Sequence, residues 1–227
     1  MSERERNTLH RKAKRLLRRA CYEEAWNVCR ELSRSGWLEW WPAHAVTARV
    51  LLEWGKAEDD QDRLHEAVKC FDTTLALIHR SQTTESDDFT LSAVTHGDRS
   101  LVRDRVAADD SADDSDSESV TDREKTAREM MELHNDRGVA LLELDEFVDA
   151  RSAFEYTLTL NPQHDRALCN LGLVHWAEGR EGIALATFDR AIESNNRNAH
   201  TFNNRGALRA EWGEHESAYV FGAALLM

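Results

Sequence analysis

The stretch that decides the fold is MELHNDRGVALLELDEFVDARSAFEYTLTLNPQH, residues 131–164, whose pattern recurs in DRALCNLGLVHWAEGREGIALATFDRAIESNNRN, residues 165–198. Three kinds of position keep one period of 34 residues, since 172 − 138 and 206 − 172 both equal 34. These are the glycines Gly138, Gly172 and Gly206, the alanines Ala150, Ala184 and Ala218, and the polar set Asp136, Asn170 and Asn204. A shared period of this length indicates a repeated structural unit.

Each unit reads as two helices joined by a short turn. In the third copy the expected helices are FNNRGALRAEWGEH, residues 202–215, and ESAYVFGAALLM, residues 216–227. The glycine and the alanine are small because they lie where the two helices meet. Phe154 and Phe188 follow the alanine by four residues, so they share its helical face and should fill the core. Pro162 should end its helix, because proline cannot continue one.

This pattern resembles the tetratricopeptide repeat (TPR) family. Family position 8 is the glycine, position 20 the alanine and position 24 the phenylalanine, which becomes Gly222 in the last copy. The resemblance implies an all-α fold, a right-handed α-solenoid of stacked antiparallel helix pairs. Three repeats are expected within residues 121–227, at about 131–164, 165–198 and 199–227.

The N-terminal region, residues 1–80, carries two weaker copies of the helix pair. The first aligns Ala13 and Ala25 with positions 8 and 20. The second aligns Ala48 with position 8, places Ala67 and Phe71 on its second helix, and needs a longer turn over residues 56–63. Five helical pairs would then stack, each burying its apolar face against its neighbours.

Residues 81–120 interrupt the pattern with an acidic insert rich in Ser and Asp. We expect it to be a disordered linker, since it cannot bury enough apolar surface to offset its ordering entropy. A transient helix over residues 91–106 is a weaker prediction. Thr121 and Glu124 read as a capping box, so the next helix should begin near Asp122.

Composition argues against several classes of protein. Acidic residues outnumber basic ones, 42 against 29, for a net charge of −13, which disfavours nucleic-acid binding by the molecule as a whole. The sequence shows no Gly-rich phosphate loop, HExxH or GxSxG motif, and the four cysteines form no CxxC pair. We therefore expect no catalytic residues, cofactor or metal, and a cytoplasmic protein, since no signal core is present.

The resemblance implies that the first helix of each repeat lines a concave groove, and that the chain is an adaptor binding a protein or peptide there. An asparagine amide offers both a donor and an acceptor to a peptide backbone, and the acidic surroundings suit a basic or neutral polar ligand. The alternative is that these are consensus residues that keep the surface polar, or, for the tryptophan, packing within its repeat. The predicted groove residues are Asn135, Asp136, Arg166, Asn170, Leu173, Trp176, His200, Asn203, Asn204 and Glu211.

A second functional hypothesis concerns the N-terminal helix. Residues 1–19 hold eight Lys or Arg and two Glu, a net of +6 by subtraction. Its apolar residues Leu9, Ala13, Leu16, Leu17 and Ala20 share one face. The alternative function is thus a regulator whose basic helix contacts nucleic acid while the repeats bind protein; otherwise this is a solvated outer face. The candidate contacts are Arg11, Lys12, Lys14, Arg15, Arg18 and Arg19.

Two apolar groups complete the predictions. Trp37, Trp40 and Trp41 crowd one turn before Pro42, and we expect them to be wedged between helices rather than to form an aromatic ligand cage. The last helix ends in AYVFGAALLM, residues 218–227. Its apolar side chains predict either self-association through this end or a truncated sequence.

Overall fold

The computed structural model describes residues 2–34, 40–84 and 114–224, of which 82–84, 114–123 and 214–224 are described by their backbone alone. All regular structure in these ranges is helical. The helices are α1 (Glu3–Leu17), α2 (Tyr22–Arg34), α3 (Trp41–Glu58), α4 (Gln61–Thr84), α5 (Asp114–Glu143), α6 (Phe147–Leu160), α7 (Asp165–Ala177), α8 (Glu181–Ser194) and α9 (Ala199–Ala224).

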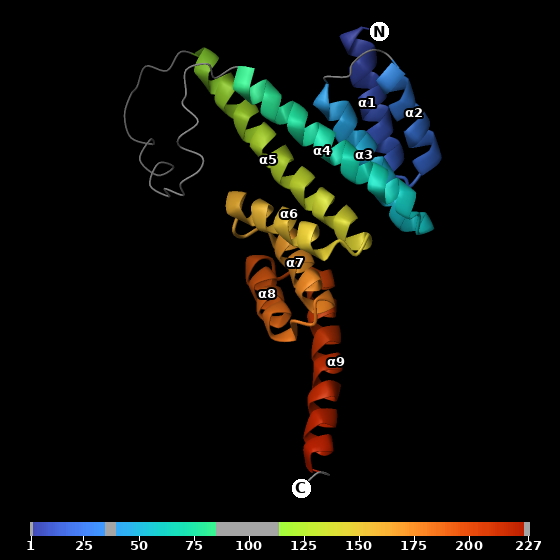
Figure 1. Ribbon diagram of the computed structural model, residues 1–227. Coiled ribbons are helices and arrows are strands. Elements are labelled where there is room, and N and C mark those ends of the chain that lie inside the picture. The colour runs from blue at the N-terminus through green and yellow to red at the C-terminus, as the bar shows by residue number, and fades with distance from the viewer. Residues whose placement is uncertain (1, 35–39, 85–113, 225–227) are drawn as a thin grey trace.

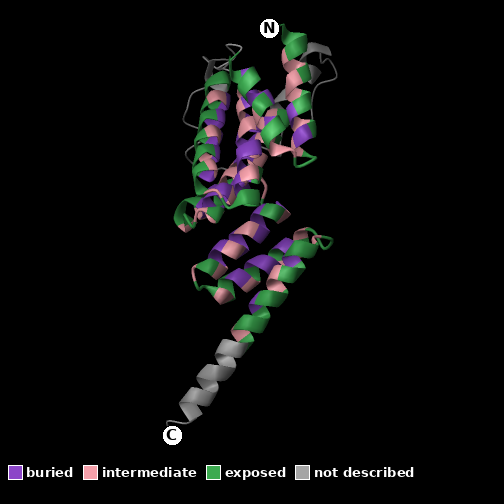
Figure 2. Ribbon diagram, turned by 90° about the vertical axis from the view of Figure 1, so that its right-hand side faces the viewer, coloured by how far each residue is buried: buried purple, intermediate pink, exposed green. Residues whose placement is uncertain are grey.

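Consecutive helices form pairs that stack along one direction. Figure 1 shows α1 beside α2 and α4 beside α5 at the N-terminal end, with α6, α7 and α8 following below them and α9 reaching away from the body. The buried residues run through the stack of helices (Figure 2). The fully buried Phe71, Phe154 and Phe188 lie in three successive pairs. The predicted all-α solenoid of helix pairs is confirmed.

Small residues set the spacing within each pair. A Cβ added at Gly138 would lie 2.6 Å from Cε1 of Phe154, and one added at Gly172 would lie 2.5 Å from Cε1 of Phe188. Contacts that short do not occur, so only glycine admits these rings. The predicted packing of glycine against its own second helix is therefore confirmed. Gly55 plays the same part in the second pair, against Leu64.

The N-terminal helices differ from the prediction in two details. The turn between α3 and α4 is not residues 56–63, because α3 continues to Glu58 and a left-handed residue, Asp59 with φ 53°, reverses the chain at once. Ala20 does not share the apolar face of α1. That helix ends at Leu17, and Ala20 lies exposed in the following turn with φ 56°.

The insert is shorter than residues 81–120 at both ends. Helix α4 continues to Thr84, and α5 begins at Asp114 rather than near Asp122. These two long helices, α4 and α5, run side by side (Figure 1). The predicted disorder and the transient helix over residues 91–106 concern positions outside the described residues.

The third copy is not a pair of helices. We expected two helices, residues 202–215 and 216–227, but α9 is one continuous helix from Ala199 to Ala224. No second helix therefore covers Gly206, and a Cβ added there would meet no atom within 4 Å. Phe202, at the position-4 aromatic of this copy, is 40% exposed.

The glycines supply a matched test of this packing. Gly172→Ala should lower the free energy of unfolding by about 1–3 kcal/mol, because the added methyl group overlaps the Phe188 ring. Gly206→Ala should raise it by roughly 0.5–1 kcal/mol, because alanine favours a helix interior and the space is open. Urea unfolding of both variants measures this, and equal effects would contradict the packing.

Candidate partner-binding groove

Polar contacts join the first helix of each pair to the first helix of the next. They lie on α3, α5, α7 and α9, and most join residues 30–35 positions apart along the chain. Because that separation is close to one repeat, each contact links equivalent turns of neighbouring helices. The face that the resemblance assigns to binding is thus crossed by interactions within the protein itself.

Arg49 on α3 forms the central contact of this face. Its Nε donates to Oδ2 of Asp136 at 2.7 Å, and its Nη1 donates to Oε1 of Glu129 at 2.8 Å. Burial alone would lower the pKa of Arg49, but the two carboxylates raise it overall. Arg49 thereby joins the N-terminal helices to α5 across the insert. This role was not predicted from the sequence, because the partners of Arg49 lie 80 and 87 positions away.

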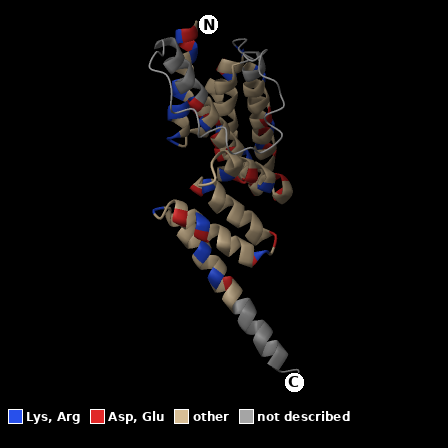
Figure 3. Ribbon diagram, turned by 90° about the vertical axis from the view of Figure 1, so that its left-hand side faces the viewer, with Lys and Arg blue, Asp and Glu red and all other residues tan. Residues whose placement is uncertain are grey.

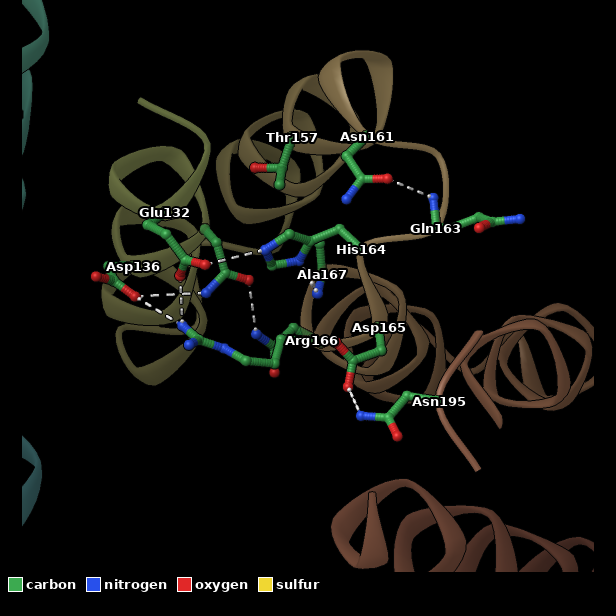
Figure 4. A network of polar contacts seen from close by, with 12 residues as sticks. Glu132, Asp136, Thr157, Asn161, Gln163, His164, Asp165, Arg166, Ala167 and Asn195 are labelled. Carbon is green, nitrogen blue, oxygen red and sulfur yellow. Dashed lines mark hydrogen bonds and ion pairs between the residues drawn. The ribbon is translucent and has the colours of Figure 1, made fainter. Parts of the chain in front are cut away.

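His164 and Arg166 continue the network from α7 (Figure 4). Nδ1 of His164 accepts the backbone N–H of Ala167 at 3.1 Å and so caps α7, which leaves Nε2 to face Glu132 at 3.5 Å. Nη2 of Arg166 lies 3.1 Å from Glu132 and 3.2 Å from Asp136. The hydrogen bond from His164 and the charge of Arg166 lower the pKa of Glu132, so it stays ionised.

The asparagine amides that were predicted to contact a peptide backbone are only partly available to a ligand. Asn135 is 1% exposed, and its Oδ1 accepts Nδ2 of Asn170 at 3.2 Å while its own Nδ2 lies 3.4 Å from Asp136. Asn170 is half-buried and keeps one N–H and its oxygen. Nδ2 of Asn204 lies 3.6 Å from Sγ of Cys169. Asn135 therefore positions Asn170.

Trp176 bridges α7 to α9. Its indole N–H donates to Oε2 of Glu211 at 3.0 Å, and its ring packs against the buried cluster around Phe188. The expected packing within its own repeat thus accounts for only part of its contacts. Asn203 is exposed on α9.

A cavity of about 390 Å³ opens between α3, α5, α7 and α9. It brings together six of the ten predicted groove residues and omits Trp176, Asn203, Asn204 and Glu211. The six are Asn135, Asp136, Arg166, Asn170, Leu173 and His200. Sequence reasoning missed the contribution of α3, from which Leu52, Glu53 and Lys56 also line the cavity.

The cavity combines an apolar wall with a charged rim. Leu52, Val139, Leu142 and Leu173 line it, and all but Leu52 are half-buried, so a bound apolar side chain would cover them further. Exposed acids at the rim include Glu53 and Glu143, and Nζ of Lys56 lies 3.7 Å from the latter. Asp136 is already paired with two arginines, so it offers a ligand little charge.

The six predicted nucleic-acid contacts do not form one surface. Arg11, Lys12, Arg15, Arg18 and Arg19 are exposed on or just after α1, whereas Lys14 is half-buried beside α3 and α5. Figure 3 shows basic residues spaced along this end of the molecule. Arg18 and Arg19 lie beyond the last residue of the helix.

Trp40 and Trp41 are half-buried, as expected for side chains wedged between helices. The Trp40 ring packs edge-on against His10 of α1, with 5.1 Å between ring centroids, and the Arg6 guanidinium lies 4.3 Å from its centroid. Both tryptophans also line a second cavity, beside Lys14. Trp37 lies outside the described residues.

The described part of the chain holds no group of three or more His, Cys, Asp or Glu side chains that could bind a metal ion. None of its helices combines the length and apolar character that a membrane-crossing segment requires.

Comparison with known proteins identifies the repeats. The family model described as tetratricopeptide repeat matches residues 135–199. Residues 135–199 contain tetratricopeptide repeats. Proteins with such repeats are generally scaffolds for protein interaction rather than catalysts. The match covers α6, α7 and α8 with the adjoining part of α5, which are the elements whose glycine–phenylalanine contacts are closest.

Solved structures extend the TPR fold to the whole chain. The structure titled MamA RS-1 ArsTM double mutant is 15% identical, with a TM-score of 0.59 over 100% of this chain and 94% of that one. A TPR protein from Parabacteroides merdae is 16% identical, with a TM-score of 0.50 over 93% of this chain and 61% of that one. At these identities the likeness shows the fold alone. No curated protein sequence matches this one.

Removal of Arg49 tests the network that joins the repeats. Arg49→Met keeps the aliphatic stem but leaves Asp136 and Glu129 with less compensation in a partly buried site. The free energy of unfolding should fall by about 1–3 kcal/mol. Arg205→Met, which breaks a more exposed pair with Asp189, should cost roughly 0–1 kcal/mol. If urea unfolding showed equal losses of unfolding free energy for both variants, the ion pairs of Arg49 would contribute no more than an ordinary surface ion pair.

Proposed function

We propose that this TPR protein binds an extended segment of a partner protein in the cavity between α3, α5, α7 and α9. The observation that carries the proposal is the apolar wall of Val139, Leu142 and Leu173, left half-buried in a hollow whose rim is polar. Concave sites with apolar walls and a few convergent polar groups are the usual form of a binding site.

Asn170 supplies the polar recognition. One of its N–H groups is held by Asn135, which fixes the plane of the amide. The remaining N–H and the oxygen can pair with the backbone of an extended peptide. The exposed acids at positions 53 and 143 favour a segment that is neutral or basic beside its apolar side chain.

Selection of peptides tests this groove. Random peptides displayed on phage and selected on the wild type should share an apolar residue beside neutral or basic ones. Leu173→Arg should weaken their binding at least about tenfold, because it fills the cavity with a charge. The matched control is Leu160→Arg, at a residue 47% exposed on α6, which should bind normally. Equal binding by both variants would place recognition elsewhere.

The alternative of nucleic-acid contact has one supporting observation. Arg11, Lys12 and Arg15 are exposed on α1, and within the described part of the chain no carboxylate pairs with their charges. The proposal would make the protein a regulator that holds a nucleic acid at its N-terminal end and a protein partner in its groove.

The salt dependence of DNA binding distinguishes the two functions. If five cations at this end contact phosphates, log K for a duplex should fall by roughly four to five per tenfold rise in salt. An Arg11→Gln/Arg15→Gln variant should reduce that slope by about two. A duplex that does not bind at 50 mM salt would exclude the alternative and leave the adaptor function.

We also propose that the protein self-associates through its C-terminal end. The open face of α9 around Gly206, with Phe202 exposed, supports this proposal. The apolar residues Val220, Leu225 and Leu226 that motivated it lie where side chains are not described.

A further inference from the structure

A second cavity, of about 440 Å³, lies between α1, α3 and α5. It is lined by the start of α3, by His10 and Lys14 of α1, and by residues 125, 126 and 129 of α5. This volume falls within the range of roughly 300–1,000 Å³ that is common for small-molecule sites. The cavity shares no lining residue with the groove proposed above.

One wall of this cavity is flat and apolar. Trp40, Trp41 and Pro42 line it at the first turn of α3, and Ala45 and Val46 continue it. The position of Trp40 is fixed by its edge-on contact with His10 and by the cation–π contact with Arg6. A planar ligand can stack on an apolar wall of this kind.

The other wall carries an excess of positive charge. Lys14 and Lys125 both line the cavity, and in the described ranges neither forms an ion pair. Glu129 is the acid beside them, but its Oε1 already accepts Nη1 of Arg49 at 2.8 Å. Burial, and the nearby cations Arg49, Arg18 and Lys125, lower the pKa of Lys14 against the opposing effect of Glu129. An anion placed between the two lysines would relieve this cost.

His10 adds an unused polar atom. Its Nδ1 is buried and has no hydrogen-bond partner in the part of the chain that is described. Burial and the charge of Lys14 lower the pKa of His10 to about 4, so the ring is neutral at pH 7. In the tautomer with the proton on Nδ1, this atom is a hydrogen-bond donor. A buried polar group without a partner usually calls for a ligand or water.

We propose that this cavity binds a small aromatic carboxylic acid, with its ring against Trp40 and Trp41 and its carboxylate between Lys14 and Lys125. This proposal does not rest on the groove or on the partner that the groove binds. The tryptophans expected to serve packing alone thus also form one wall of a ligand site.

Calorimetric titration of the full chain tests the assignment with indole-3-acetate as the probe. The acid should bind with a Kd of roughly 0.1–1 mM, as expected for a ligand of this size. Indole-3-acetamide, which has the same ring and no charge, should bind at least about tenfold more weakly. Equal binding of acid and amide, or no binding of the acid, would overturn the proposal.

Variants locate the site. Lys14→Met keeps the aliphatic stem and should weaken the acid at least about tenfold, while Lys12→Met, exposed on the same helix outside the cavity, should leave it unchanged. Lys125→Met changes an exposed rim residue, so it serves where Lys14→Met fails to fold, with an expected loss of about threefold. Binding unaffected by either cavity variant would refute the assignment.

A further titration, with a peptide, distinguishes a small-molecule ligand from the C-terminus of a protein. The peptide acetyl-Gly-Gly-Trp with a free carboxylate should bind no more tightly than indole-3-acetate, because only its indole ring and its carboxylate match the two walls of the cavity. If this peptide bound at least tenfold more tightly than the free acid, the occupant would be the C-terminus of a partner protein and the small-molecule assignment would be wrong.

Discussion

The close approach of a glycine on one helix to a phenylalanine on the next sets the spacing on which the stack depends. At Gly138 and Gly172 the aromatic ring occupies the space that a Cβ would need, so each pair closes to one fixed distance. Each pair can bury its apolar face only against its neighbours, so an error in this distance would pass into every interface along the stack. The polar face inherits its register from these contacts, since Asn170 meets Asn135 only when both pairs are closed.

The repeat register could be predicted because small and aromatic residues recur along the sequence at one period. The same reasoning reached six of the residues that line the groove. It could not find Arg49, whose partners Glu129 and Asp136 lie 80 and 87 positions away across the insert. It also took Asn135 for a ligand contact, because burial of that side chain follows from how α5 meets α7. The break expected between residues 215 and 216 is absent, and the nearby Gly213 permits a turn without requiring one.

Arg49 also stands between the two cavities. Asp136 lines the groove and Glu129 lines the site beside the tryptophans, and the same guanidinium holds both carboxylates. A charge introduced at either site changes the field on a group shared with the other. Such a shared group is a physical basis for coupling between sites, of the magnitude of a partly buried ion pair rather than of a large conformational change.

The polar contacts along the concave face join only neighbouring helices, which makes each interface between pairs a separate joint. A force that parted Asn135 from Asn170 would act on the joint between α5 and α7 and would rotate the helices that follow it. Helix α9, at 26 residues, is about 39 Å long. Used as a lever, it would turn a rotation of about 5° at that joint into a displacement of roughly 3 Å at its far end. A small rotation at the groove would therefore become a larger displacement at the C-terminal end of α9.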